Sequence, residues 1–320
     1  MVRFSEFESY ATTTQTTSTS TTSFDTCNGI RYNTTGIRVA GDGTEGSNPS
    51  QLKEPRCVYV DANDTVYVCD TINARIQKWT KGAVLGTTVA GGSEGANSNQ
   101  LKKPRGLTFD QNGNMYVADT ENHRVQRFRP PSNIGTTVAG STTGSSGNSD
   151  SLLDLPTNVV VDNSGNLYIT DYNNKRVMKY PSNTSSGIIA FGSVSFSKPY
   201  GIAFQSNSTN QFYVSDEGNK NAAGWTSGVS TPSATYGSSS TFNQATSVAV
   251  DWYNNLYVAD TNLNRVTMFC VGSSTEKTVI GGTSGSTPSL IETTGIAFDS
   301  KMNLYVTSKT PPAVYKYLRI

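Results

Sequence analysis

The sequence predicts an all-β propeller of six four-stranded blades, and three observations support this prediction. A pattern with a period of roughly 45–50 residues recurs along the 320-residue chain, which is typical of stacked repeats. Each copy contains short apolar and aromatic runs separated by Gly, Asn and Asp, as in strands joined by tight turns. A four-stranded unit cannot bury both of its faces alone, so the copies must stack, and radial stacking closes a ring.

The clearest copy is PRGLTFDQNGNMYVADTENHRVQRF at 104–128. Five further copies share its order of runs and end on an aromatic residue; they lie at 55–79, 156–180, 199–225, 245–269 and 293–317. The first run of most copies ends on Asp, whose carboxylate can accept the backbone N–H two residues further on. Each copy therefore predicts an inner strand, a tight turn and two further strands.

A fourth run, of the type TTVAG, supplies the outer strand of each blade. One such run precedes the first copy, at residues 37–41, and none follows the last copy, which stops at Ile320. We expect residues 37–41 to pair with residues 314–317 as the outer strand of the last blade, which leaves no open strand edge in the ring. The expected domain covers residues 27–320, and the Thr/Ser-rich residues 1–26 are expected to form a disordered tail.

The repeated pattern resembles the NHL-repeat family, whose units read Gly-Asn-Leu-Tyr-Val-Ala-Asp-Thr-x-Asn-x-Arg-Val. The resemblance covers residues 36–320 and is close in units one, two, three and five. Unit four has Asn221 in place of Arg, and unit six has Ser308 in place of Asp. The resemblance implies a six-bladed propeller that binds a ligand, or one of three activities found among related propellers.

Each of those activities makes a demand on the residues. A zinc-dependent lyase would need several histidines, and His123 is the only one, in a slot that predicts an exposed turn residue. A calcium-dependent lactonase would need acidic groups around the channel. The residues that enter the inner strands are not acidic: Arg56, Arg105, Thr157, Tyr200, Thr246 and Thr294. An RNA-binding module, as in tripartite-motif proteins, would need a broad basic surface, but 25 basic residues are balanced by 24 acidic ones.

A repeated Asp and Arg, five residues apart, flank the turn between the second and third strands. The pairs are Asp70 with Arg75, Asp119 with Arg124, Asp171 with Arg176, and Asp260 with Arg265. A site that is used once does not need one copy per blade, so we interpret these residues as structural turn pairs. We expect each pair to be exposed and able to form a bidentate contact, which stabilises little by itself.

The four cysteines suggest two bridges. Cys57 and Cys69 are expected to lie opposite each other on neighbouring strands, either as thiols or as a cross-strand disulfide. Cys27 and Cys270 are expected on the same rim of adjacent blades, where a disulfide would fasten the N-terminal strand to the ring. Two bridges favour an oxidising compartment. Candidate N-glycosylation sites in predicted loops favour an extracellular protein, although no signal peptide is visible; they are Asn33, Asn63, Asn183 and Asn207.

The function that these observations favour is a non-catalytic scaffold that binds a protein or a glycan. The loops into the inner strands suit recognition because they are long and variable. One sector of them is expected to be basic; it contains Lys53, Arg56, Lys102, Lys103, Arg105 and Tyr200. We expect a monomer without a cofactor, a metal or a membrane span, and no nucleic-acid partner. The alternatives are a calcium-dependent, lactonase- or esterase-like hydrolase and an RNA-binding module.

Overall fold

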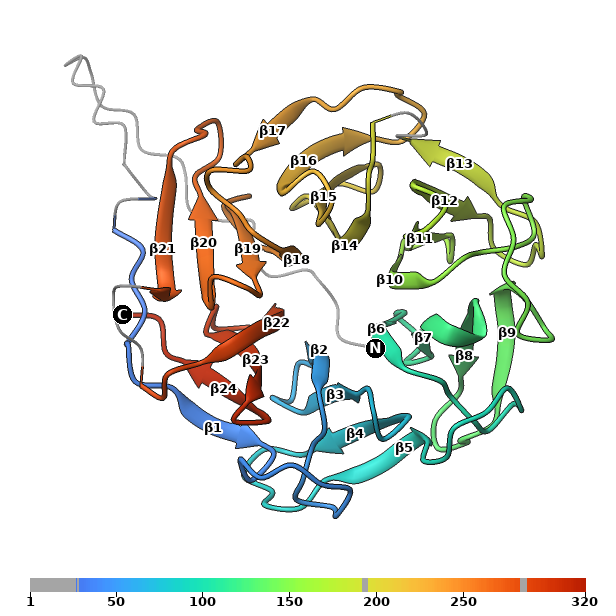
Figure 1. Ribbon diagram of the computed structural model, residues 1–320, viewed down its shortest axis with the longest axis horizontal. Coiled ribbons are helices and arrows are strands. Elements are labelled where there is room, and N and C mark those ends of the chain that lie inside the picture. Colours follow the sequence, from blue (N-terminus) through green and yellow to red (C-terminus); the bar gives the residue numbers. More distant parts are fainter. Residues whose placement is uncertain (1–26, 28, 192–194, 283–286) are drawn as a thin grey trace, which may run out of the picture.

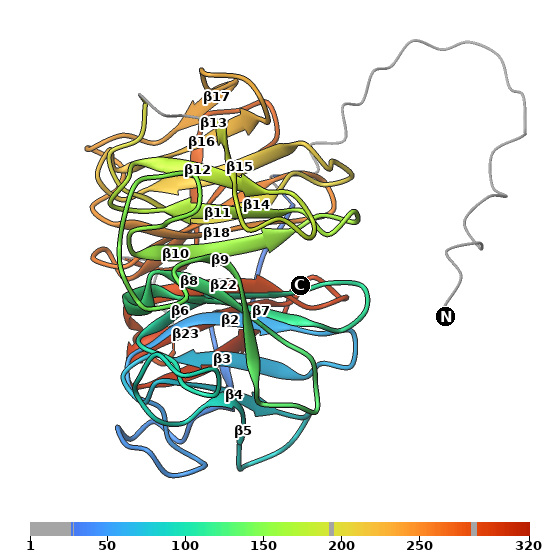
Figure 2. The same ribbon diagram turned by 90° about the vertical axis from the view of Figure 1, so that its right-hand side faces the viewer.

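The computed structural model describes residues 27, 29–191, 195–282 and 287–320, so the expected tail at 1–26 lies outside the described residues. Six antiparallel four-stranded sheets stand around a central axis (Figure 1, and turned by 90° in Figure 2). The helical element that the structure describes in full is a 3-10 turn, Thr120–Asn122. The prediction of an all-β, six-bladed propeller is confirmed.

Each blade is an antiparallel meander from the axis outwards. Blade one holds β2 (Pro55–Val60), β3 (Val66–Asp70), β4 (Arg75–Trp79) and β5 (Thr87–Gly91). Blade two holds β6 (Pro104–Phe109), β7 (Met115–Asp119), β8 (Arg124–Phe128) and β9 (Gly135–Gly140). Blade three holds β10 (Pro156–Val161), β11 (Leu167–Asp171), β12 (Arg176–Tyr180) and β13 (Ile188–Phe191). Blade four holds β14 (Pro199–Phe204), β15 (Gln211–Asp216), β16 (Asn221–Thr226) and β17 (Ala234–Tyr236). Blade five holds β18 (Ala245–Val250), β19 (Leu256–Asp260), β20 (Arg265–Phe269) and β21 (Glu276–Gly281).

Blade six combines the two ends of the described chain. Its inner three strands are β22 (Ile291–Phe298), β23 (Leu304–Thr310) and β24 (Ala313–Tyr317), and its outer strand is β1 (Ile37–Ala40). Strand β1 runs antiparallel to β24, with Ile37 opposite Lys316 and Arg38 opposite Tyr315 (Figure 1). The N-terminal strand therefore completes the blade that the C-terminal residues leave with three strands.

The turns from the inner to the second strand are fixed by the repeated Asp. In blade two, Oδ1 of Asp110 accepts the backbone N–H groups of Asn112 and Asn114, both at 2.9 Å. The same pattern recurs at four other residues: Asp61, Asp162, Asp251 and Asp299. The carboxylate thus supplies the acceptor that a tight turn lacks, as the sequence predicted.

The inner strands of neighbouring blades approach closely. A Cβ placed on Gly106 would lie 2.6 Å from the carbonyl oxygen of Thr157 in the next blade. A Cβ on Gly295 would lie 2.9 Å from the Cα of Cys57, across the seam where the ring closes. That seam also holds a hydrogen bond from Thr294 Oγ1 to the carbonyl of Pro55, at 2.7 Å. These positions near the axis therefore need small residues, because the backbones of neighbouring blades are in contact there.

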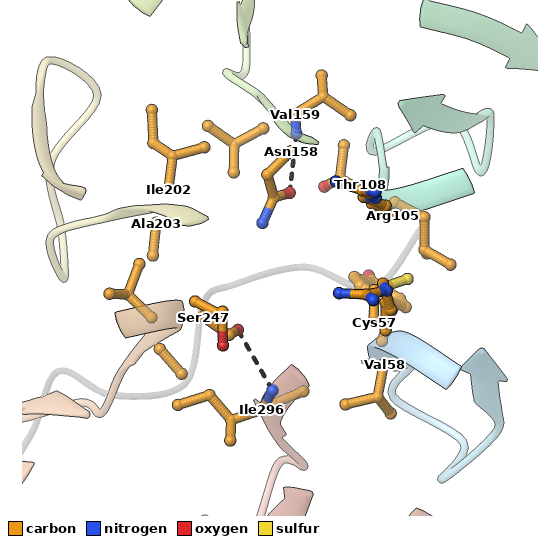
Figure 3. Close-up of a pocket in the computed structure, with 18 of the residues that line it drawn as sticks. Cys57, Val58, Arg105, Thr108, Asn158, Val159, Ile202, Ala203, Ser247 and Ile296 are labelled. Atoms are coloured by element: carbon orange, nitrogen blue, oxygen red, sulfur yellow. Dashed lines mark hydrogen bonds between the residues drawn. The ribbon is translucent and has the colours of Figure 1, made fainter. Parts of the chain in front are cut away.

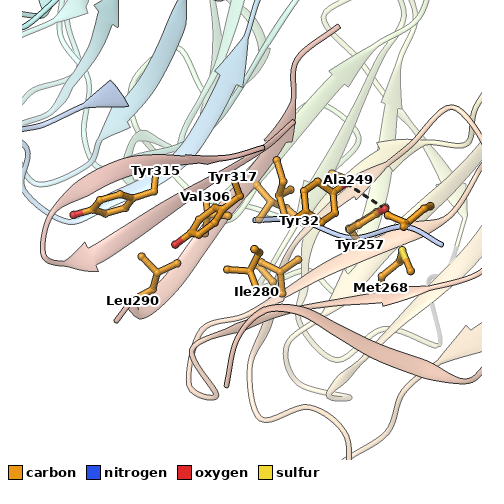
Figure 4. Close-up of a cluster of buried hydrophobic side chains, with 14 of the residues drawn as sticks. Tyr32, Ala249, Tyr257, Met268, Ile280, Leu290, Val306, Tyr315 and Tyr317 are labelled. Carbon is orange, nitrogen blue, oxygen red and sulfur yellow. Dashed lines mark hydrogen bonds between the residues drawn. The ribbon is translucent and has the colours of Figure 1, made fainter. Parts of the chain in front are cut away.

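Apolar side chains fill the spaces between blades. Between blades five and six, Tyr257, Tyr315 and Tyr317 pack in one cluster with Tyr32 from the N-terminal segment (Figure 4). The Tyr32 hydroxyl donates to the Tyr257 hydroxyl at 3.4 Å. The segment before β1 is thus part of the core between two blades and extends beyond the edge strand.

Both predicted disulfides form. Cys57 and Cys69 face each other on β2 and β3 of blade one, with their Cα atoms 5.1 Å apart. Cys27 and Cys270 join the N-terminal segment to the end of β20 in blade five, with their Cα atoms 5.7 Å apart. The second bridge therefore fastens the N-terminal segment to blade five, next to the blade that β1 completes, and the two bridges indicate an oxidising compartment.

Candidate binding site at the channel mouth

The two ends of the ring carry different loops. One end, here called the mouth face, carries the turns between second and third strands and the loops that lead into the inner strands. The opposite end, the far face, carries the other two sets of turns. On the mouth face the two sets of loops are bonded to each other, because Asn73 Nδ2 donates to the carbonyl of Gly46 at 2.8 Å.

The repeated Asp–Arg pairs hold this face together. In blade two, Arg124 Nε donates to Asp119 Oδ2 at 2.8 Å, and the rest of its guanidinium donates to the carbonyls of Ala96, Asn97 and Gln100. Asp119 is fully buried, and Arg124 is only 2% exposed. The pairs Asp70–Arg75 and Asp171–Arg176 have the same geometry. The expectation of exposed, bidentate pairs was wrong: one guanidinium nitrogen contacts the Asp, and the others anchor the loop.

The fourth pair does not form. In blade five, both oxygens of Asp260 accept backbone N–H groups of the incoming loop, from Asn243 at 2.9 Å and from Gln244 at 3.0 Å. Arg265 instead donates to the carbonyl of Thr241, at 2.5 Å. The loop of blade five thus occupies the oxygen that receives the arginine in blades one to three.

The inner strands of all six blades surround a central cavity of about 270 Å³ (Figure 3). One buried aliphatic side chain from each inner strand lines it: Val58, Leu107, Val159, Ile202, Val248 and Ile296. Two polar side chains, Asn158 and Ser247, point into the opening, and their oxygens accept the backbone N–H groups of Val159 and Ile296 (Figure 3). The cavity is therefore mainly apolar, with a few polar groups.

The residues that enter the inner strands divide into two kinds. Thr157, Thr246 and Thr294 turn their hydroxyls into the seams, where each donates to a backbone carbonyl of the next blade. Arg56, Arg105 and Tyr200 are too long for that arrangement, and all three line the cavity. The mouth of the channel consequently has its large polar side chains on blades one, two and four.

The basic sector that the sequence predicted is largely neutralised. Lys53 pairs with Glu45 at 2.8 Å, and Lys103 pairs with Glu121 at 2.7 Å. Lys102 lies 3.8 Å from Glu121 as well. Arg56 pairs with Glu54 at 3.3 Å. The expectation of local basic character is therefore wrong for the lysines, because carboxylates of the same loops and turns lie against them.

Arg105 differs from the other arginines of this face, which have polar partners: Arg56, Arg75, Arg124, Arg176 and Arg265. Within the described residues its side chain has neither a hydrogen bond nor an ion pair, and its buried Nε lacks an acceptor, as do the Nε atoms of Arg127 and Arg265. It is partly buried at the edge of the cavity (Figure 3). A buried guanidinium donor without an acceptor is uncommon in proteins and needs an explanation.

Two tyrosines, Tyr172 and Tyr200, and the carboxylate of Glu217 lie next to the arginines at the channel mouth. Tyr172 donates to Glu217 Oε2 at 2.9 Å, and Gln244 donates to Glu217 Oε1 at 3.0 Å. The ring of Tyr172 meets the ring of Tyr200 edge-on, with centroids 6.0 Å apart. Burial, followed by the Glu217 charge, raises the pKa of Tyr172 well above its ordinary value, so this hydroxyl stays protonated and donates.

Arg56 joins this group from the other side. Burial acts to lower its pKa, but Tyr200 and Glu54 outweigh that effect, and the net pKa is raised. Arg56 therefore remains a cation beside Tyr200. We call Arg56, Arg105, Tyr172, Tyr200 and Glu217 the mouth cluster. Sequence reasoning missed Tyr172 as a member, because it occupies the slot that holds Thr in repeats one, two and five.

His123 lies outside the mouth cluster. It ends the 3-10 turn of blade two with a left-handed backbone, φ 54°, and its Nδ1 accepts the N–H of Leu155 at 3.1 Å. Its side chain is 17% exposed, so the expected exposed turn residue is in fact a loop contact. Among the described residues, no three His, Cys, Asp or Glu side chains gather as a metal site. The carboxylate of the mouth cluster is bonded to Tyr172 and Gln244, so this group of residues does not fit a hard cation.

No helix in the described part of the chain has the length and apolar character needed to cross a membrane. The candidate N-glycosylation residues are all exposed.

The geometry is that of a six-bladed β-propeller with a lined central channel. Three of its repeats are NHL repeats: the NHL repeat model matches residues 52–79, 101–128 and 153–180, which are the first three units of the sequence pattern. No curated protein sequence matches the chain.

Several solved structures share the fold at low sequence identity. A gluconolactonase from Xanthomonas campestris is 14% identical with a TM-score of 0.66, over 86% of this chain and 88% of that one. A virginiamycin B lyase from Staphylococcus aureus, in complex with quinupristin, is 14% identical with a TM-score of 0.60, over 85% and 83%. A protein of unknown function from Bacteroides thetaiotaomicron is 17% identical with a TM-score of 0.69, over 89% and 76%. At these identities the likeness concerns the fold alone.

Proposed function

We propose that this propeller is a non-catalytic, extracellular binding module, and that its site is the mouth cluster. The ligand would present a carboxylate, on an acidic protein segment or on an acidic glycan. The observation that carries the proposal is Arg105, a cation at the cavity edge whose Nε has no acceptor within the described residues. A ligand carboxylate would supply that acceptor through a charge-assisted hydrogen bond.

The surroundings of Arg105 support this ligand class. Arg56 provides a second cation, and the edge-on rings of Tyr172 and Tyr200 lie beside it. Lys53, Lys102 and Lys103 of the same face lie against carboxylates, so these three lysines add little unspecific attraction. Recognition would then depend on the few groups at the mouth and hardly on the overall charge, which is +1.

The test is binding of two anionic probes, a fluorescent oligo-glutamate peptide and an oligogalacturonate, by anisotropy and calorimetry. We expect Arg105→Gln to weaken binding about tenfold or more, since a hydrogen bond to a charged group contributes roughly 1.5–3 kcal/mol. The matched control is Arg129→Gln, an exposed arginine on the far face. Equal weakening by both variants, or no binding of either probe, would contradict the proposal.

A second candidate function is lactone hydrolysis, which the shared fold with a gluconolactonase favours. Turnover of gluconolactone and of an aryl ester, measured with calcium and with a chelator, tests it directly. Calcium-dependent turnover that is lost in Glu217→Gln would replace the binding proposal. An RNA oligonucleotide in the anisotropy assay tests the RNA-binding alternative in the same way.

A further inference from the structure

The four candidate N-glycosylation residues share a face of the ring. Asn63 and Asn207 lie in turns between inner and second strands, and Asn183 lies in the loop between β12 and β13. Asn33 precedes β1, and its N–H donates to the carbonyl of Leu318, just beyond the end of β24, at 2.8 Å. Because strands alternate in direction, all four positions are at the far face, opposite the mouth cluster.

Each of the four asparagines is accessible to an enzyme. All are exposed, and no residue in the described part of the chain accepts a hydrogen bond from any of their side-chain Nδ2 groups. The carboxamide of Asn33 uses only its oxygen, which accepts the N–H of Thr35 at 2.9 Å. They belong to blades one, three, four and six, which are two pairs of opposite blades in a six-bladed ring. Groups attached there would be spread over the whole far face.

The mouth face lacks such a site for a chemical reason. In the whole sequence, Asn-x-Ser/Thr also occurs at Asn48-Pro49-Ser50, in the loop that leads into the inner strand of blade one. Proline at the middle position prevents glycosylation. The other mouth-face Asn-Ser pairs, at 97–98 and 148–149, are followed by Asn99 and Asp150, so they lack the hydroxyl residue. The mouth face therefore has Asn and Ser in abundance without an acceptor site.

We infer that N-linked glycans at Asn33, Asn63, Asn183 and Asn207 cover the far face of the propeller and leave the mouth face bare. In the reaction, Asn Nδ2 attacks the anomeric carbon of an oligosaccharide carried on a polyprenyl diphosphate. A C–N bond forms, the C–O bond to the diphosphate breaks, the diphosphate leaves with the electron pair, and the amide proton passes to a base of the transferase. The two disulfides place the chain in an oxidising compartment, where this donor acts.

The consequence is directional. A glycan is bulky and solubilising, so a glycosylated far face is closed to partners and to aggregation. The bare face is the one that carries the long loops and the channel mouth. The inference does not depend on the identity of the ligand, because it concerns only which surface remains accessible.

The experiment is peptide mapping of the protein from its natural source, before and after PNGase F, which converts each glycosylated Asn to Asp. We expect conversion at residues 33, 63, 183 and 207, and none at residue 48. In a eukaryotic secretory host, each single Asn→Gln variant should lose the mass of one glycan. Absence of glycans from the natural protein, or a glycan on the mouth face, would overturn the inference.

A second variant tests the role of the proline. In the same host, Pro49→Ala should add one glycan, at Asn48, and Pro49→Ala combined with Ser50→Ala should not. If Pro49→Ala is secreted without the added glycan, the mouth face is kept bare by something other than Pro49, and that part of the inference is wrong.

Discussion

The disulfide between Cys27 and Cys270 should contribute more to stability than the disulfide between Cys57 and Cys69. The two bridges differ mainly in the chain that they enclose, because their sequence separations are 243 and 12 residues. A bridge restricts the unfolded chain, and the lost entropy grows with the logarithm of the loop length. With that relation, the long bridge contributes about 5.5 kcal/mol and the short one about 2.8 kcal/mol at 25 °C.

The perturbation is the double replacement of each pair by alanine. Alanine is preferred to serine because Cys27 and Cys69 are buried and a hydroxyl would lack a partner there. With a shift of roughly 2 °C per kcal/mol for a chain of this size, Cys27→Ala with Cys270→Ala should lower the Tm by about 11 °C. Cys57→Ala with Cys69→Ala should lower it by about 5–6 °C on the same scale.

The assay is calorimetry and urea denaturation without reductant, together with hydrogen exchange at the backbone of β1. Loss of the long bridge should also speed exchange in β1, since the N-terminal segment then loses its covalent link to blade five and keeps only non-covalent contacts, among them its pairing with β24 and the Tyr32 cluster. Deletion of residues 27–41 should destabilise further, because blade six loses its outer strand. The reasoning is refuted if loss of the short bridge lowers the Tm as much as loss of the long one. It is also refuted if the hydrogen-exchange rate of β1 is the same with and without the long bridge.

Two further predictions follow from buried charges. Arg124→Ala should lower the free energy of unfolding by about 3–5 kcal/mol, because Asp119 stays buried without its arginine and the loop carbonyls lose their donor. Arg265→Ala should lower it clearly less, because Arg265 has no Asp partner. Equal losses in urea titrations would contradict the anchoring role of Arg124. For Asp299, burial acts to raise the pKa, but Lys316 at 2.8 Å and the Asn303 amide outweigh it, so the pKa lies below its ordinary value of 3.8. The contribution of Asp299 to stability is therefore present above pH 3.8 and is lost as the pH falls through the folded-state pKa. The difference in the free energy of unfolding between the unchanged protein and Asp299→Asn should therefore become smaller on acidification, and a larger difference would contradict this assignment.

Most of the fold could be predicted from the sequence because the information is local and repeated. The Asp61 turn, for example, is set by residues within four positions, and it fixes the register that places Cys57 opposite Cys69. The outer strand of the last blade could be assigned because each of the other five blades has its own. These features need no knowledge of contacts between distant segments.

The charges of the mouth face could not be predicted in this way. Whether Arg124 is buried depends on carbonyls that lie 24–28 residues earlier in the chain. Whether Lys103 is free depends on how the turn that holds Glu121 meets the incoming loop. The predicted basic sector failed for this reason: counting basic residues in a loop says nothing about the carboxylates that pack against them.

The position that enters each inner strand shows how one repeat can serve both structure and binding. Where it is Thr, in blades three, five and six, the hydroxyl reaches a carbonyl of the next blade and ties the seam. Where it is Arg or Tyr, in blades one, two and four, the longer side chain extends to the channel. Since Gly106 and Thr71 help to pack the seams beside Arg105, those blades are not left without inter-blade contacts. The repeat can therefore vary at these three positions while the ring stays closed. Arg56, Arg105 and Tyr200 then make one side of the channel mouth chemically different from the other, and a ligand could recognise that side.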